Sequence, residues 1–181
     1  RTNATGTPTY RWFAVVASGV NNYVKADSAG NYSDGNPTLF LLALDKAVGD
    51  TWTRGTNYYK VSLPIDSAQS ALQATGALNF SPLYGANQEV TNIYIGDLHG
   101  SVWKLNFQGV AASDWSMGNL TAYKNAGGQP APFFTAKTSA GVRQPITAAP
   151  GLFAGPTVQG VPTYYVMVGT GKFLESADAT S

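Results

Sequence analysis

The 181-residue sequence has no cysteine, one histidine and only 12% charged residues. The lack of cysteine excludes a thiol nucleophile, a thiolate zinc site, an iron–sulfur cluster and a disulfide scaffold. Eleven Lys and Arg against ten Asp and Glu give a net charge of +1, so the basic stripe of a nucleic-acid binder is absent. No apolar run is long enough for a membrane span. We expect neither a nucleic-acid partner nor a membrane-spanning segment, and the chain shows no signal peptide. It begins at Arg1 rather than Met, which favours a fragment whose targeting segment lies elsewhere.

Short apolar runs, rich in β-branched and aromatic residues, are the dominant secondary-structure signal in the sequence. Residues 10–17, 38–45 and 164–168 are nearly continuous runs of this kind, and 58–63 and 101–107 alternate between apolar and polar residues. Runs of this length, bounded by glycine and proline, favour strands over helices. The aromatic residues within them are expected in the core: Trp12, Phe40, Trp103, Phe107 and Phe173. Helix signals are poor, the best being a short helix over residues 66–75 with Asp66 as its N-cap. The pattern predicts an all-β fold.

The segment IGDLHGSVW, residues 95–103, predicts a tight β-hairpin. A strand ends at Gly96, and the carboxylate of Asp97 can accept hydrogen bonds from turn amides. Gly100 supplies the positive φ that such a loop needs. Trp103 then returns on the apolar face. His99, at the tip, is expected to be a solvated turn residue rather than a catalytic base, because a base there would be poorly oriented.

A weak repeat suggests β-propeller blades. Three apolar strands end in small or glycine-containing elbows near Ala17, Gly96 and Gly169, and the first two are followed by a second strand. Strand, tight hairpin, strand and looser outer strand are typical of a blade. A blade needs about 40–45 residues, so the chain would hold about three or four blades, part of a larger propeller. Residues 1–181 form one region, with loop insertions at about 26–37 and 109–131.

Five segments together are similar to the C-terminal β-propeller domain of the type IV pilus tip-associated adhesin and assembly family, the PilY/PilC type. They occur in family order and span residues 11–175. The segments are RWFAVVASGVNNY (11–23), LFLLALDKAVGD (39–50), YIGDLHGSVWKLNF (94–107), PFFTAK with QPITAAPGLF (132–137 and 144–153) and VMVGTGKFLE (166–175). The resemblance implies a modified seven-bladed propeller, with this chain as its later blades.

The same resemblance implies a non-enzymatic protein on the outside of a Gram-negative cell, at the pilus tip or the outer-membrane surface. Family members support pilus assembly, oppose retraction and mediate adhesion. Their expected partners are pilins or minor pilins, together with a host or surface ligand that the sequence does not identify. Two alternatives stay open. LLALDKAVGDTW, residues 41–52, also resembles the blade repeats of quinone-dependent propeller dehydrogenases, and a carbohydrate-binding β protein would use exposed aromatic residues. Those lying near loops are Tyr23, Tyr32, Trp52, Tyr84 and Trp115.

Calcium is bound by several family members, through an Asp/Asn-rich loop just before the strand that carries the YxGD motif. Here the matching stretch, residues 81–96, offers Asn87, Glu89 and Asn92 together with one glutamine, hence one carboxylate. Calcium needs six to eight oxygen ligands, several of them usually carboxylates. We expect no cofactor and no metal site, with those three residues as weak candidates. Another loop holds Asp27, Asn31, Asp34 and Asn36 but lacks the calcium-loop spacing, and is expected to be solvated.

Overall fold

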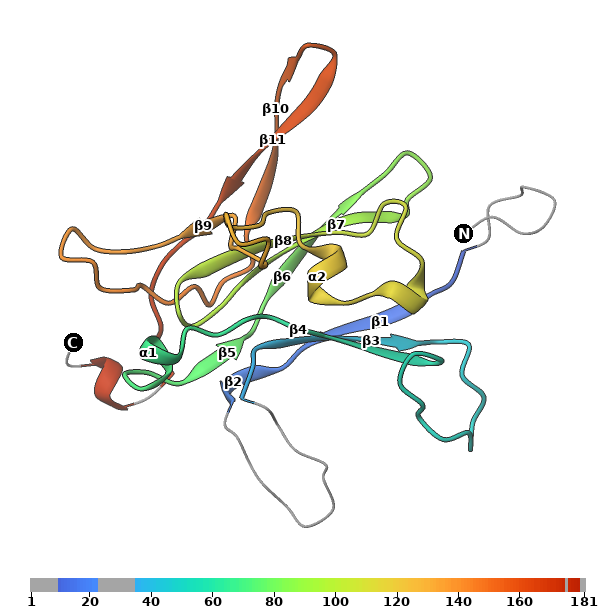
Figure 1. The fold of residues 1–181 in the computed structure, drawn as a ribbon, viewed down its shortest axis with the longest axis horizontal. Helices are drawn as coiled ribbons and strands as arrows, with labels where there is room; N and C mark the ends of the chain where they lie inside the picture. Colours follow the sequence, from blue (N-terminus) through green and yellow to red (C-terminus); the bar gives the residue numbers. More distant parts are fainter. Residues whose placement is uncertain (1–9, 23–34, 175, 180–181) are drawn as a thin grey trace.

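Strands dominate the computed structural model, which describes residues 10–22, 35–174 and 176–179 (Figure 1). The helical segments in these ranges are single turns. The strands are β1 (Phe13–Ala17), β2 (Gly19–Asn22), β3 (Thr38–Ala43), β4 (Tyr58–Ser62), β5 (Thr75–Ala77), β6 (Phe80–Tyr84), β7 (Val90–Gly96), β8 (Ser101–Asn106), β9 (Phe134–Thr135), β10 (Gly151–Val158) and β11 (Val161–Met167). The helical turns are α1 (Ser67–Ser70), η1 (Ala112–Asp114), α2 (Met117–Leu120) and η2 (Ser176–Ala179). The prediction of an all-β chain is confirmed.

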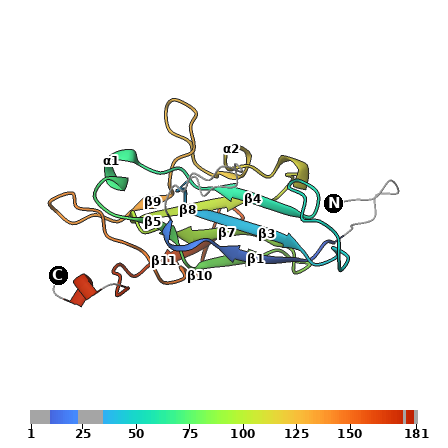
Figure 2. The same cartoon turned by 90° about the horizontal axis from the view of Figure 1, so that it is seen from below.

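The strands form antiparallel sheets, and most pairs join strands that follow one another in the chain; β1 with β3 and β2 with β5 are the exceptions. One sheet has the order β6-β7-β8-β9, a second β1-β3-β4, and β10 pairs with β11 as a hairpin. A two-stranded pair joins β2, which lies between β1 and β3 in sequence, to β5, which lies between β4 and β6. Figures 1 and 2 show the three main sheets arranged side by side in chain order. Within the described ranges no sheet closes on itself, and a succession of meanders is what propeller blades look like.

The sequence repeat corresponds to a repeat in topology. β1 and β7, which end at Ala17 and Gly96, each pair antiparallel with the next long strand, β3 or β8. β4 then pairs with β3, and β9 pairs with β8, so that each is the outer strand of its sheet. β11, which precedes the Gly169 elbow, pairs with β10 in the way that β7 pairs with β6. The two hairpins are adjacent, because β10 contacts β6. The elbows therefore occupy equivalent places in three successive sheets.

The main core lies between the β1-β3-β4 sheet and the β6–β9 sheet. Its buried members are Leu39, Leu41, Tyr59, Val61, Leu63, Ala77, Ile93, Ile95, Trp103, Leu105, Ala112, Met117 and Leu120. Three of them come from the 109–131 region, which therefore contains helical turns packed onto the sheets rather than a plain loop insertion. The other predicted insertion, at about 26–37, falls mostly outside the described residues.

Trp115 closes this core from the side. Its ring lies 5.3 Å from that of Phe13, 5.0 Å from Tyr59 and 5.2 Å from Phe107, and its Nε1 donates to the carbonyl of Val110 at 3.2 Å. Sequence alone grouped Trp115 with the loop aromatics that could be free to bind sugars. The structure uses it instead to join the two sheets, since Phe13 and Tyr59 belong to one sheet and Phe107 follows β8 of the other.

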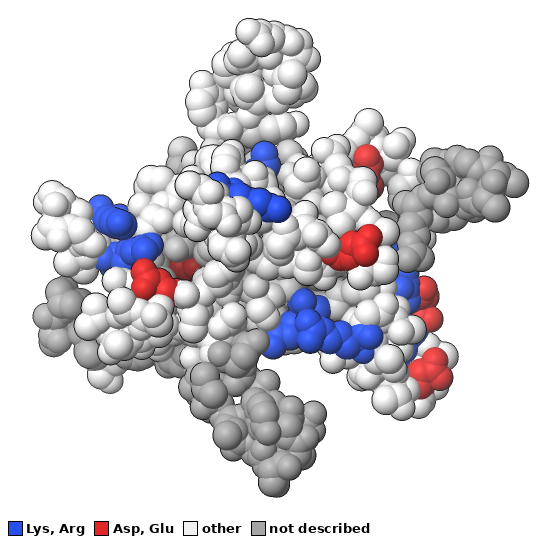
Figure 3. All heavy atoms as spheres, in the orientation of Figure 1, with Lys and Arg blue, Asp and Glu red and all other residues white. Residues whose placement is uncertain are grey.

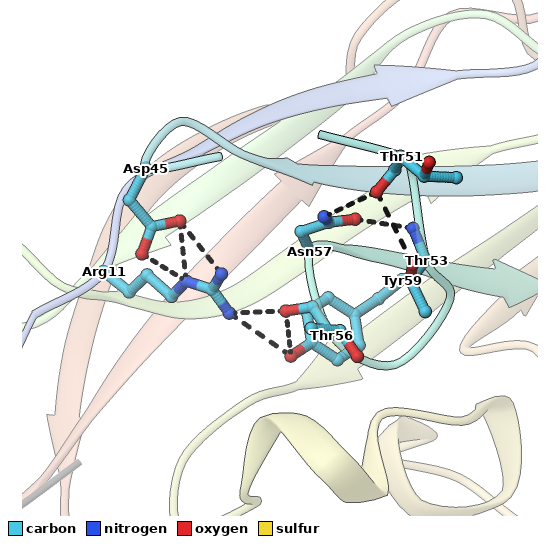
Figure 4. A network of polar contacts seen from close by, with 7 residues as sticks. All are labelled: Arg11, Asp45, Thr51, Thr53, Thr56, Asn57 and Tyr59. Atoms are coloured by element: carbon cyan, nitrogen blue, oxygen red, sulfur yellow. Dashed lines mark hydrogen bonds and ion pairs between the residues drawn. The ribbon is translucent and has the colours of Figure 1, made fainter. Parts of the chain in front are cut away.

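The long loop between β3 and β4 is held in one conformation by polar contacts (Figure 4). Arg11 donates from Nη2 and Nε to Asp45 at 2.9 and 3.0 Å, and from Nη1 to the carbonyl of Thr56 at 2.9 Å. These bonds lower the pKa of Asp45 and raise that of Arg11. Within the loop, the side chain of Asn57 accepts the N–H of Thr53 at 2.7 Å. The loop is thus an ordered projection from the sheet.

Residues 66–75 form less helix than the sequence predicts. Asp66 is the N-cap, as expected, and its Oδ1 accepts the N–H of Ala68 at 3.0 Å. The helix ends at Ser70, and a turn leads from it to β5, which begins at Thr75. In the part of the chain that the structure describes, no helix has the length and apolar character to cross a membrane.

Candidate functional site

The hairpin between β7 and β8 is the feature that the sequence singles out most clearly. The N–H of Asp97 donates to the carbonyl of Ser101 at 2.9 Å, and the N–H of Gly100 donates to the carbonyl of Asp97 at 3.1 Å. Gly100 has φ +75°, and a Cβ there would lie 2.6 Å from the carbonyl oxygen of Gln144. At Gly96, a Cβ would lie 2.4 Å from the Cγ2 of Ile146. Both glycines are therefore required by close approach of residues 144–146, and Gly100 by its backbone conformation as well.

The carboxylate of Asp97 is an internal acceptor of this hairpin. Its Oδ1 accepts the N–H of Ser101 and its Oδ2 accepts the indole Nε1–H of Trp103, each at 2.8 Å. Asp97 and Trp103 are only 2% and 3% exposed. Burial raises the pKa of Asp97, while the hydrogen bonds from Trp103 and Ser101 oppose the rise. With both oxygens engaged and no access to solvent, Asp97 supports the fold and has no free face for chemistry.

The prediction that His99 is exposed is wrong. The residue is 4% exposed, and its Nε2 lies 3.2 Å from the carbonyl oxygen of Gln73. The hairpin tip is covered from two sides, because Leu98 donates its N–H to the carbonyl of Gly76 and Ile146 donates to that of Asp97. Hairpin tips are usually solvated, and the covering segments lie too far away in sequence for local patterns to reveal them.

The three weak calcium candidates are not brought together. The backbone N–H of Asn87 donates to the Oε2 of Glu89 at 2.9 Å, so the only carboxylate of the β6–β7 turn is engaged by that turn. Asn92 lies in β7, three residues after Glu89, which is about 10 Å at strand spacing. It is 8% exposed and donates to the Oγ1 of Thr91 at 3.3 Å. Among the described residues, no group of three or more His, Asp or Glu has metal-site geometry.

The structure describes only one residue of the second loop cluster, which the sequence places at residues 27–36. Asp27, Asn31 and Asp34 lie outside the described residues. Asn36 is described, and its carbonyl accepts hydrogen bonds from the Nδ2 of Asn22 at 3.1 Å and from the Oγ1 of Thr38 at 3.0 Å. Its visible role is to join the end of that loop to β2 and β3.

The aromatic residues divide differently from the prediction. Trp52 and Tyr84 are about half exposed, and Trp52 is covered on one face by the Nζ of Lys46 at 4.9 Å from the ring centroid. Tyr23 and Tyr32 lie outside the described residues. Two aromatics expected in the core, Trp12 and Phe173, are exposed at 77% and 80%. Both lie outside the strands, Trp12 directly before β1 and Phe173 beyond the end of β11 at Met167, and so escape the sheet packing that buries Trp103.

Sequence reasoning missed one concave feature entirely. A pocket lies between the turn that follows α1 and the tight turn at residues 138–142, and Arg143 lines it. The side chain of Arg143 contacts Asp66 across 77 residues of sequence. No local pattern at either residue indicates the other, so only the fold could reveal this pairing.

Comparison with known proteins finds relatives over half of the chain. The chain is 35% identical over 92 residues to the "Type IV pilus biogenesis factor PilY1 homolog" of Xylella fastidiosa, which is 51% of this chain and 6% of that protein. It is 36% identical over 97 residues to "Type IV pilus biogenesis factor PilY1" of Pseudomonas aeruginosa strain UCBPP-PA14, and 40% identical over 95 residues to that of strain PAO1. Each of these two matches covers 48% of this chain and 8% of the relative. No family model matches.

A solved structure supports the fold over almost the whole chain. The crystal structure of the Pseudomonas aeruginosa PilY1 C-terminal domain superposes with a TM-score of 0.61 at 24% sequence identity. The match covers 93% of this chain and 31% of that one. The predicted propeller-type β fold and the predicted resemblance to the PilY/PilC-type family are both confirmed, and the chain corresponds to about a third of the matched structure.

Proposed function

We propose that this chain, a homologue of the PilY1 proteins, is part of a type IV pilus biogenesis factor. The observation that carries the proposal is the identity of 35–40% over about half of the chain to proteins with that name. The role is that of a rigid platform and not of an enzyme. This is supported by the engagement of Asp97 and His99 in the interior of the hairpin. Stacked sheets of this kind hold variable loops in fixed positions, and binding surfaces usually lie on such loops.

The proposed location is the outside of a Gram-negative cell, at the pilus tip or the outer-membrane surface. There the protein would contact pilins or minor pilins, oppose retraction and mediate adhesion. The surface agrees with a role in protein contacts, since Figure 3 shows few charged atoms and broad uncharged areas.

Deleting the complete gene in its own host should abolish or strongly reduce surface pili, and removing the retraction motor as well should restore them. The physical reason is that a factor which promotes assembly and opposes retraction becomes dispensable once retraction stops. Pili sheared from the cells and counted by immunoblot and electron microscopy give the measurement.

Two complementing variants link the result to this chain. Asp97→Ala, which removes the acceptor inside the hairpin, should fail to restore pili, whereas Trp52→Ala, at a half-exposed ring, should restore them. Unchanged piliation in both deletion backgrounds would remove the main support for the proposal.

We also propose that the β6–β7 turn has lost tight calcium binding. Its one carboxylate, Glu89, already accepts the N–H of Asn87, and Asn92 is buried in β7. Isothermal titration of the chain with calcium should show no site tighter than about 10⁻⁴ M, the weak end of the range for extracellular modules. Glu89→Gln is the matched variant and should titrate like the parent. A tighter site that Glu89→Gln abolishes would contradict the proposal.

A further inference from the structure

The pocket beside Arg143 has two preformed walls. It has a volume of about 260 Å³ and is lined by Gln69, Leu72, Gln73, Ala140, Gly141, Val142 and Arg143. One wall is a tight turn, in which Thr138 donates its N–H to the carbonyl of Val142 and Gly141 donates to that of Thr138, both at 2.9 Å. Gly141 has φ +84°, which fixes the turn further. These contacts fix the shape of this wall.

The opposite wall is anchored on the buried hairpin. Gln73 donates its side-chain N–H to the carbonyl of Leu98, and its own carbonyl oxygen lies 3.2 Å from the Nε2 of His99. Gln73 and Gln69 also close the turn after α1, since the N–H of Gln73 donates to the carbonyl of Gln69 at 2.9 Å. The contact between His99 and Gln73 therefore joins this wall to the buried tip of the hairpin.

Arg143 has hydrogen-bonding capacity to spare. Its side chain is 17% exposed, and the hydrogen bond from its Nη2 to the Oδ2 of Asp66 is 3.4 Å long, well beyond the 2.7–2.9 Å of a strong guanidinium–carboxylate bond. Asp66 is partly committed elsewhere, because its Oδ1 caps α1. A guanidinium carries five N–H donors, so most of them are available to a ligand. The mostly buried guanidinium of Arg143, whose contact with Asp66 is long, therefore favours an incoming anion.

The surroundings define what kind of anion fits. Lys137 forms an antiparallel bridge with Arg143, which places both side chains on the same face and adds a second positive charge. Figure 3 shows Lys and Arg atoms grouped at the left of the view, with acidic atoms beside them. At the rim, Leu72 and Val142 are exposed at 78% and 63%. Positive charge inside and apolar side chains outside match an acidic side chain flanked by apolar residues.

We propose that this pocket binds a glutamate side chain of a partner polypeptide, with the carboxylate on Arg143 and neighbouring apolar residues on Leu72 and Val142. The volume suits one side chain and its attachments rather than a large ligand. The site does not depend on a role in pilus assembly, because every observation that supports it concerns this chain alone.

The test is an NMR titration of the isotopically labelled full chain with the capped peptide acetyl-Leu-Glu-Ala-Leu-amide. We expect saturable shifts of the Arg143 Nε–Hε signal and of the Leu72 and Val142 methyl groups at millimolar peptide. The counterpart peptide with glutamine in place of glutamate should bind about 10-fold more weakly or worse, because charge-assisted hydrogen bonds are the stronger ones.

Three variants make the result specific. Arg143→Gln should weaken binding about 10-fold or more, whereas Arg54→Gln, at an exposed arginine outside the pocket, should leave it unchanged. Asp66→Asn should tighten binding, because asparagine still caps α1 while the competing carboxylate is gone. Three results would each overturn the proposal. They are the absence of shifts at a peptide concentration of about 10⁻² M, which is well above a millimolar dissociation constant, equal binding of the glutamine peptide, and undiminished binding by a folded Arg143→Gln chain.

Discussion

Replacing Trp115 with alanine is expected to lower the free energy of unfolding by about 3–5 kcal/mol, the range for a large aromatic removed from a packed site. The indole packs against three rings from two sheets, those of Phe13, Tyr59 and Phe107, at centroid distances of 5.0–5.3 Å. Its removal would leave a cavity where the two sheets meet, and would free the carbonyl of Val110. Urea unfolding followed by far-UV circular dichroism, which does not rely on tryptophan fluorescence, gives the measurement.

Trp52→Ala is the matched control for this prediction. It removes the same side chain from a half-exposed position, where the ring contacts the Lys46 ammonium and Tyr58. Such surface contacts contribute about 1 kcal/mol or less. If the two variants unfold at the same urea concentration, Trp115 does not join the sheets as described.

Removing the carboxylate of Asp97 should have the second large effect. Asp97→Ala leaves two buried donors, the N–H of Ser101 and the indole N–H of Trp103, without their acceptor. Each such donor costs about 1–3 kcal/mol. The alanine variant also escapes the cost of burying a carboxylate, which partly offsets the loss. We expect a net destabilisation of about 2–4 kcal/mol, measured by urea unfolding at pH 7.

Asp97→Asn separates hydrogen bonding from charge. Asparagine keeps one acceptor oxygen but places an NH₂ group toward the other donor, so it should be less damaging than alanine. Burial raises the native pKa of Asp97 above its value of about 3.9 in the unfolded chain. The native state therefore binds the proton more tightly, and the contribution of Asp97 to stability is greatest below the unfolded pKa and declines as pH rises through the native one.

The stability difference between the parent chain and Asp97→Asn should follow this sign. The parent should gain most over the asparagine variant below about pH 4 and lose part of that advantage toward neutral pH. Unfolding both proteins in urea at several pH values between about 3.5 and 7 covers the window. An advantage that grows with pH would mean that the hydrogen bonds from Ser101 and Trp103 outweigh desolvation, so that the native pKa is lowered.

Strand prediction succeeded for the longer apolar runs without proline. It failed for β2, β5 and β9, which have only two to four residues each, and for two longer strands that contain proline. The strands at residues 38–45, 58–63 and 101–107 appear as β3, β4 and β8, and each lacks proline. β6 and β10 were not predicted, and they contain Pro82 and Pro156. β6 lies at the edge of its sheet, and the register of β10 shifts around Pro156. Proline is tolerated at such positions, but it removes the local signal.

The candidate site likewise has features that nearby residues predict and features that depend on distant segments. The hairpin, the positive φ of Gly100 and the acceptor role of Asp97 follow from residues within six positions of one another. The burial of His99 depends on Gln73, 26 residues earlier, and the pocket depends on segments 77 residues apart. Local sequence patterns do not predict contacts between segments so far apart in the chain.

By itself, the sequence determined the antiparallel strands, their glycine elbows and the relationship to PilY1 proteins, because these depend on the conformational preferences and order of neighbouring residues. Only the tertiary structure decided that Trp115 packs against the core while Trp12 is exposed to solvent, and that Arg143 lines a pocket. Burial is a property of how separate sheets approach one another, and that approach is set by the sum of many weak contacts rather than by any single residue.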